Sequence, residues 1–221
     1  MEIGEVKIEW LGHSGFLIQN SKVIYIDPYE IKDGLPKADI ILITHGHYDH
    51  CSVKDIEKVV QEGTRIFVTA DSQSKIARFE TPVRMEVVSV NEDYDFGNLK
   101  ISTVPAYNTD KTFHTKEEGL VGYLLKMHDI ILYHAGDTDK IPEMQKLTGH
   151  NHPEKTFIAL LPVSGRYVMT PDEAADAAKI IKPTIAVPMH YGAIVGDEND
   201  AIDFKEMCEE NSIRCEILEK F

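Results

Sequence analysis

A buried strand that leads directly into a cluster of metal-binding side chains is the feature that most constrains this chain. Residues 40–43 (Ile-Ile-Leu-Ile) form an apolar run typical of a strand that is buried on both faces. The loop that follows contains His45, His47, Asp49 and His50. Neutral imidazole nitrogen and carboxylate oxygen are the ligands that zinc and similar divalent metals prefer. One isolated histidine would indicate only a solvated polar loop, but four such side chains after a buried strand predict a metal site.

The spacing within this loop predicts how the ligands divide. We expect Gly46 to allow a tight turn, so that His45 and His47 point to one side. Asp49 and His50 are adjacent and must diverge, so they serve a second metal more easily than the first. The loop is therefore consistent with more than one metal ion.

The pattern His45-x-His47-x-Asp49-His50 resembles the signature of the metallo-β-lactamase superfamily, whose members are mostly two-metal hydrolases. Similar segments follow in the expected order, at 135–139 (Ala-Gly-Asp-Thr-Asp) and at 188–192 (Pro-Met-His-Tyr-Gly). Residues 11–14 (Leu-Gly-His-Ser) resemble a narrower branch, which contains ascorbate-6-phosphate lactonase and small uncharacterised hydrolases. The resemblance covers nearly the whole chain. It implies an α/β fold, a four-layer αββα sandwich.

The resemblance also implies a ligand set. The first metal would be bound by His45, His47 and a third histidine, and the second by Asp49, His50 and His190, with Asp137 bridging the two. Asp49 would orient the attacking water and move a proton. Taken alone, Asp137 and His190 are also explained as a turn residue and a packed histidine.

The third ligand of the first metal is where this sequence departs from the commonest pattern. Asn108, not a histidine, follows Pro105-Ala106-Tyr107, and the next histidine is His114. A neutral amide oxygen is a weak donor beside an imidazole, so we expect His114 to bind. Phe113 is expected to anchor this segment by burying its ring. In the alternative, His114 is exposed and the first metal keeps two histidines and waters.

Each candidate ligand lies just beyond the carboxyl end of an apolar segment. The segments 40–43, 99–104, 130–133 and 185–188 lead to His45, His114, Asp137 and His190 respectively. Because ligand sites in α/β sheets gather at the carboxyl ends of strands, four such loops are expected to surround one point.

The remaining pattern predicts a single domain over residues 1–221. Apolar segments at 6–11, 16–19 and 23–26 indicate an antiparallel meander. Helices are expected after a capping box at Ser52, after Thr170 and over 201–211, with a last strand at 214–218. No linker or low-complexity segment divides the chain, and strands and helices recur loosely in each half.

Composition narrows the class of protein. A formal charge of −14 argues against a nucleic-acid binder, which needs a basic surface. Three scattered cysteines make no disulfide framework, and residues 1–5 do not resemble a signal peptide. No apolar run approaches the ~20 residues that span a bilayer. We expect a cytoplasmic enzyme with a small-molecule substrate, no nucleic-acid partner and no membrane partner; the sequence does not predict the oligomeric state.

The expected chemistry is metal-assisted hydrolysis by two divalent ions, zinc first, with manganese or iron as alternatives. Such a site hydrolyses ester, lactone, thioester, amide and phosphodiester bonds, and the branch resemblance favours a lactone or phosphodiester of a small anionic metabolite. Arg166 and Lys111 are candidate substrate-binding cations, although each is equally well explained as a solvated surface charge.

Two other classes of function stay open. One is a metal-stabilised binding or scaffold protein, and the other is a di-iron redox protein on the same fold. Di-iron relatives usually have a carboxylate where His47 stands. His128 and His134 are predicted to be structural, and His150 and His152 to lie on a solvated surface. His13 lies at a turn that could face the metal loop, but hydrogen bonding to backbone is the favoured role, and Cys51 could contact a metal, but a buried hydrophobic role is favoured.

Overall fold

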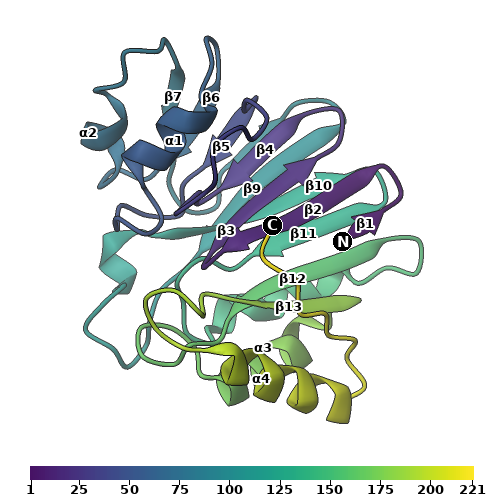
Figure 1. The fold of residues 1–221 in the computed structure, drawn as a ribbon. Coiled ribbons are helices and arrows are strands. Elements are labelled where there is room, and N and C mark those ends of the chain that lie inside the picture. Colours follow the sequence, from purple (N-terminus) through teal and green to yellow (C-terminus); the bar gives the residue numbers. More distant parts are fainter. The chain divides into compact units, whose positions relative to one another are not determined.

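The computed structural model describes all 221 residues, and their contacts divide the chain into two compact units. The first unit contains residues 1–89 and 218–221, and the second contains residues 90–217. Each unit has one β-sheet of its own (Figure 1). The expectation of one domain over residues 1–221 stays a prediction.

The first unit contains a seven-stranded sheet whose spatial order follows the chain. Its strands are β1 (Glu2–Ile3), β2 (Val6–Gly12), β3 (Gly15–Gln19), β4 (Val23–Ile26), β5 (Ile40–Leu42), β6 (Arg65–Val68) and β7 (Arg84–Val87). Strands β1 to β4 pair antiparallel, which confirms the predicted meander, and β4 to β7 pair parallel. Every residue of β5 is buried, as its uninterrupted apolar sequence predicts.

Two helices accompany the parallel strands of this unit, α1 (Val53–Val59) and α2 (Gln73–Ile76). Ile56 and Val59 of α1 join the same buried cluster as Ile41 and Ile43. The predicted capping box at Ser52 is wrong in detail, because the Ser52 hydroxyl donates to Asp55 Oδ2 at 2.6 Å and makes no cap bond.

The second unit contains a six-stranded sheet in the order β13-β12-β11-β10-β9-β8. The strands are β8 (Asp93–Asp95), β9 (Leu99–Pro105), β10 (Val121–Met127), β11 (Ile130–His134), β12 (Thr156–Pro162) and β13 (Ile185–Met189). Strands β8 to β11 pair antiparallel, whereas β11, β12 and β13 are parallel. The short helices η1 (Lys116–Glu118) and η2 (Pro142–His150) lie in the connections.

Helices α3 (Pro171–Ile181) and α4 (Glu198–Glu210) pack against each other in this unit (Figure 1). The predicted start of α3 is confirmed, because Thr170 and Glu173 form a reciprocal capping box. Helix α4 begins before the predicted residue 201, at a capping box between Asp197 and Asp200. None of the helices is long and apolar enough to cross a bilayer.

The predicted last strand at 214–218 is wrong. Only Cys215 pairs there, as an isolated parallel bridge with Ala186. The amide of Ala186 donates to the Arg214 carbonyl and the amide of Glu216 donates to the Ala186 carbonyl, and the ladder extends no further. The chain then continues to residues 218–221, which belong to the first unit, where the Phe221 amide bonds the Trp10 carbonyl at 2.8 Å.

Gly122 provides a test of how tightly β10 approaches the end of β11. A Cβ at this position would lie 2.6 Å from the His134 carbonyl oxygen and 2.7 Å from that of Ala135, both of which are backbone atoms. Gly122→Ala should therefore lower the free energy of unfolding by about 1–3 kcal/mol, because the backbone that leads to Asp137 must shift. Urea titration measures this change.

Gly149→Ala is the matched control, since nothing lies within 4 Å of a Cβ at residue 149. Equal unfolding midpoints for Gly122→Ala and Gly149→Ala would contradict the close approach.

Candidate metal-binding clusters

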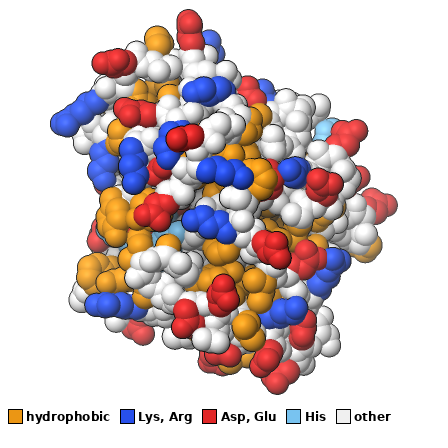
Figure 2. Space-filling model, in the orientation of Figure 1, with side chains coloured by type: hydrophobic (Ala, Val, Ile, Leu, Met, Phe, Trp, Pro, Cys, Tyr) orange, Lys and Arg blue, Asp and Glu red, His pale blue; other side chains and the backbone are white.

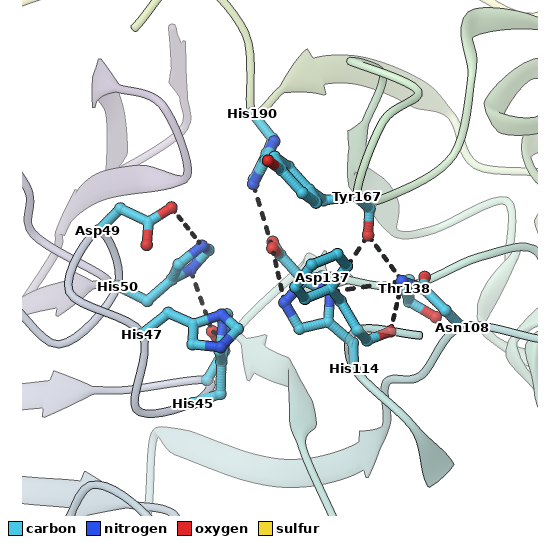
Figure 3. Close-up of polar contacts among 12 residues, drawn as sticks. His45, His47, Asp49, His50, Asn108, His114, Asp137, Thr138, Tyr167 and His190 are labelled. Carbon is cyan, nitrogen blue, oxygen red and sulfur yellow. Dashed lines mark hydrogen bonds and ion pairs between the residues drawn. The ribbon is translucent and has the colours of Figure 1, made fainter. Parts of the chain in front are cut away.

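The loop after β5 brings three imidazoles of the first unit together (Figure 3). His45 Nε2 lies 3.0 Å from His47 Nδ1, and the ring centroids of His45 and His50 are 4.0 Å apart. The amides of His50 and Cys51 both bond the His47 carbonyl, which forms the turn. Residues that the sequence singles out as one ligand loop therefore do lie side by side.

Asp27 fixes the orientation of His50. Its Oδ2 atom accepts from His50 Nδ1 at 2.8 Å and from the Thr44 hydroxyl at 2.5 Å, and its Oδ1 accepts from the Thr44 amide at 2.8 Å. All three side chains are fully buried. Since Nδ1 is committed to Asp27, Nε2 is the nitrogen with which His50 would bind a metal.

His13 also belongs to this first cluster, although hydrogen bonding to backbone is the favoured prediction for its ring. Its Nε2 lies 2.9 Å from Asp49 Oδ2, its ring is 1% exposed, and its backbone is left-handed with φ of 52°. The Trp10 indole donates to the His13 carbonyl at 2.9 Å. The available signal was its position in the turn between β2 and β3, at the carboxyl end of β2.

Gly46 also permits a close packing contact that was not predicted. Its φ is not in the left-handed region, but its amide donates to Asp71 Oδ2 at 2.7 Å. A Cβ on residue 46 would lie only 2.5 Å from that oxygen. The Lys75 ammonium donates to the Gly46 carbonyl. The glycine therefore permits the close approach of Asp71, which anchors the ligand loop.

A second cluster lies within the second unit and contains Asp137, His190 and His114 (Figure 3). Asp137 Oδ2 is 3.1 Å from His190 Nε2 and 3.5 Å from His114 Nε2. Each of the three side chains is 2% exposed. His114 is buried in this cluster, which excludes the alternative in which it is exposed.

The two histidines of the second cluster are held by groups that were not predicted. His190 Nδ1 lies 2.8 Å from the Ser164 hydroxyl, and His114 Nδ1 lies 3.1 Å from the Tyr167 carbonyl. Both histidines have left-handed backbones, with φ of 63° and 58°. Such conformations cost energy for a residue with a side chain and are frequent at functional sites.

The segment that carries His114 is fastened by Asp139. Asp139 Oδ2 accepts from the Thr109 amide at 2.7 Å, and its Oδ1 accepts from the Lys111 ammonium. Burial disfavours the ammonium, but the bonds from Lys111 to Asp139 and Asp110 outweigh that effect and raise its pKa. The charge of Lys111 is thus paired inside this segment.

The surroundings of Arg166 differ from those of Lys111. Arg166 is exposed, and its guanidinium lies 5.1 Å from the centroid of the Tyr167 ring.

Phe113 does not bury its ring as predicted. It is 50% exposed and meets the Tyr167 ring edge-on at 5.2 Å between centroids.

The remaining histidines differ in their exposure, and only His134 and His152 have the exposure that was predicted. His128 and His152 are exposed and His150 is half-buried, whereas His134 is buried and accepts from the Gly136 amide at 3.2 Å. Burial raises the pKa of the Cys51 thiol to about 11. Cys51 is buried and belongs to the same apolar cluster as Ile41 and Ile43.

The donor chemistry of each cluster fits a borderline divalent metal. His50, His114 and His190 each direct Nδ1 to a carboxylate, a carbonyl or a hydroxyl. Metal-binding histidines almost always make such a bond with their other ring nitrogen, because it fixes the tautomer and the ring plane. Carboxylates accompany the imidazoles in both units, as in mixed nitrogen and oxygen metal sites.

Comparison with known proteins agrees with this chemistry. A family model described as a beta-lactamase superfamily domain matches residues 7–190. A UPF0173 metal-dependent hydrolase from Methanopyrus kandleri is 31% identical over 227 residues, which cover 96% of each chain. A protein from Parabacteroides distasonis described as a metal-dependent hydrolase has a crystal structure that matches with a TM-score of 0.82 at 32% identity, covering 97% of this chain and 94% of that one.

The chain therefore belongs to the metallo-β-lactamase superfamily, and the predicted fold class is confirmed. Its class of activity is metal-dependent hydrolysis. CmlA, a diiron beta-hydroxylase from Streptomyces venezuelae, also matches with a TM-score of 0.77, but at 14% identity and over 53% of its own chain. That likeness shows the fold alone.

Asp27 should be the residue whose loss most clearly disturbs the first cluster without removing a ligand. Asp27→Asn leaves the donors of Thr44 and His50 without a carboxylate, which should lower the free energy of unfolding by about 1–3 kcal/mol. Metal affinity should fall about 10–100-fold, the usual effect of losing a group that orients a ligand histidine. Competition with a chelating dye measures the affinity.

The control is Asp39→Asn. Asp39 is a carboxylate of the same unit that accepts from the Val23 amide, and it precedes β5, whereas the ligand loop follows β5. Equal metal affinity in the two variants would show that Asp27 has no role in orienting His50.

Proposed function

We propose that this chain hydrolyses an ester, lactone or phosphodiester bond of a small anionic molecule with two divalent metal ions. The observation that carries the proposal is that Nδ1 of His50, His114 and His190 lies within 2.8–3.1 Å of a polar group of the protein, which leaves Nε2 of each ring for a metal. Histidines that served only packing would not all need Nδ1 bonded to the protein and Nε2 left for a ligand.

The proposed ligand set combines both clusters. The first ion is assigned to His45, His47 and His114, and the second to Asp49, His50 and His190, with Asp137 shared between them. Membership of the superfamily supports this division, and so does the proximity of the residues within each unit. Zinc suits imidazole and carboxylate donors best, and manganese and iron are the alternatives.

When bound, two such ions lower the pKa of water from 15.7 to about 7 and polarise the bond to be broken. We assign to Asp49 the orientation of the attacking water and the acceptance of its proton at the carboxylate. This role is supported by the imidazoles around it, because Asp49 Oδ2 lies 2.9 Å from His13 Nε2 and 3.5 Å from His50 Nε2. Two fixed rings would hold the carboxylate in one rotamer.

The candidate substrate cations differ in what they are able to do. Lys111 is paired with Asp139 and Asp110, so we assign it to holding the segment that carries His114. Arg166 is exposed and its guanidinium lies over the Tyr167 ring, so we assign it to the substrate's negative charge. A planar guanidinium binds carboxylate and phosphate in a bidentate manner.

A substrate panel tests the proposal. Protein loaded with zinc or manganese should hydrolyse at least one member of a set of nitrophenyl esters, lactones and bis-nitrophenyl phosphate. A chelator should remove the activity, and the metal should restore it. A flat response to every member would favour a metal-stabilised binding protein.

The stoichiometry of metal binding should approach two ions per chain. The proposed set has seven side chains, too many for one tetrahedral ion. Elemental analysis of protein reloaded with zinc and then desalted gives the ratio. Saturation at one ion would contradict the two-metal mechanism.

Asp137→Ala should abolish hydrolysis of any substrate found, with a loss of more than about 100-fold, because a direct ligand contributes more than the groups behind it. At least one ion should be bound more weakly, while the circular dichroism spectrum stays that of the parent. Asp129→Ala is the control, since Asp129 is an exposed turn residue just before β11 and Asp137 follows its other end. Full activity in Asp137→Ala would exclude the residue from the site.

A further inference from the structure

Asn108 bonds both to the segment that ends at His114 and to Tyr167, and its Nδ2 also lies 3.4 Å from His114 Nδ1. Its amide nitrogen Nδ2 donates to the Tyr167 carbonyl at 2.7 Å and to the Phe113 carbonyl at 2.9 Å. Its backbone amide donates to the His114 carbonyl at 2.7 Å. The side chain is only 6% exposed, so these bonds are made away from bulk water, where they are strongest.

The Tyr167 carbonyl is shared between Asn108 and His114 (Figure 3). It lies 3.1 Å from His114 Nδ1, and the opposite ring nitrogen, Nε2, lies 3.5 Å from Asp137 Oδ2. The carbonyl can fix the imidazole only if the carbonyl itself is fixed, and Asn108 is the side chain that holds it. The same amide holds the Phe113 carbonyl, directly before the left-handed backbone of His114.

The oxygen of the Asn108 side chain is buried and has no hydrogen-bond partner in the protein. A buried amide oxygen without a partner costs folding free energy, so the position requires something that outweighs this cost. The two hydrogen bonds that Nδ2 donates to the Phe113 and Tyr167 carbonyls offset this cost. Aspartate, which has the same shape, donates nothing, and leucine has no polar group.

We propose that Asn108 is a positioning residue for His114, acting through the donors of its amide nitrogen and not as a metal ligand. The inference rests on the proposed function in one respect, which is that His114 binds a metal ion. The competing role, in which the amide oxygen binds the metal directly, predicts the opposite result in one variant.

That variant is Asn108→Asp. It keeps the shape of the side chain, removes both donors and supplies a charged oxygen in place of a neutral one. If Asn108 acts as a positioning residue, zinc affinity measured against a chelating dye should fall about 10–100-fold. If the oxygen is a ligand, affinity should rise, because carboxylate oxygen binds zinc more strongly than amide oxygen. A rise, or no change, would overturn the proposal.

A second measurement uses protein without metal. Loss of the Asn108 donors should loosen the segment before His114, so trypsin should cleave Asn108→Asp after Lys111 at least several-fold faster than the parent. The control is Asn211→Asp, which removes an amide that donates to the Met207 carbonyl at 2.7 Å on an exposed helix end. Equal cleavage rates in Asn108→Asp and Asn211→Asp would overturn the proposal.

His114→Ala separates this inference from the proposed function. It should weaken zinc binding more than Asn108→Asp does, because it removes the ligand itself. Unchanged affinity in His114→Ala would show that His114 is not a ligand, and both claims would then fail. A weakened His114→Ala beside an unchanged Asn108→Asp would overturn only the role of Asn108.

Discussion

The hydrogen bond at the Nδ1 nitrogen of His50, His114 and His190 is the interaction on which both clusters depend. An imidazole can rotate and exchange its proton between two nitrogens, so without that bond neither its direction nor its tautomer is defined. In two cases the strand pairing supplies the partner. Asp27 follows β4 and the His45 loop follows β5, and these strands are parallel neighbours. Ser164 follows β12 and His190 follows β13, which are also parallel neighbours.

This arrangement explains which parts of the site could be predicted from the sequence. Apolar runs such as 40–43 define strands, and a ligand motif placed directly after one needs no further information. Asp27 and Ser164 stand alone in the sequence, between residues with no similar chemistry, and their role depends on which strands become neighbours. The His13 ring is another such case, because only the turn between β2 and β3 puts it 2.9 Å from Asp49. Long-range pairing is not encoded in local pattern.

Backbone strain accompanies the same residues. His13, His114 and His190 all have φ near 50–65°, in the left-handed region that a side chain disfavours by about 1–2 kcal/mol. The strain is tolerated because surrounding bonds fix each position, such as those from Ser164 to His190 and from Asn108 to the His114 carbonyl. Mutations of these supports should therefore change the ligands before they change the fold.

The charge of the chain is compatible with an anionic substrate only if the site is locally positive. The whole protein carries −14, which disfavours the approach of any anion, although basic side chains are interspersed among the acidic ones on the face shown in Figure 2. The proposed centre would hold two divalent ions and two carboxylate ligands, Asp49 and Asp137, which would leave a net local charge of about +2. The imidazole ligands are neutral when they bind metal, so they do not reduce that charge. The metal ions themselves would then supply most of the attraction for the substrate, and Arg166 would contribute orientation more than affinity.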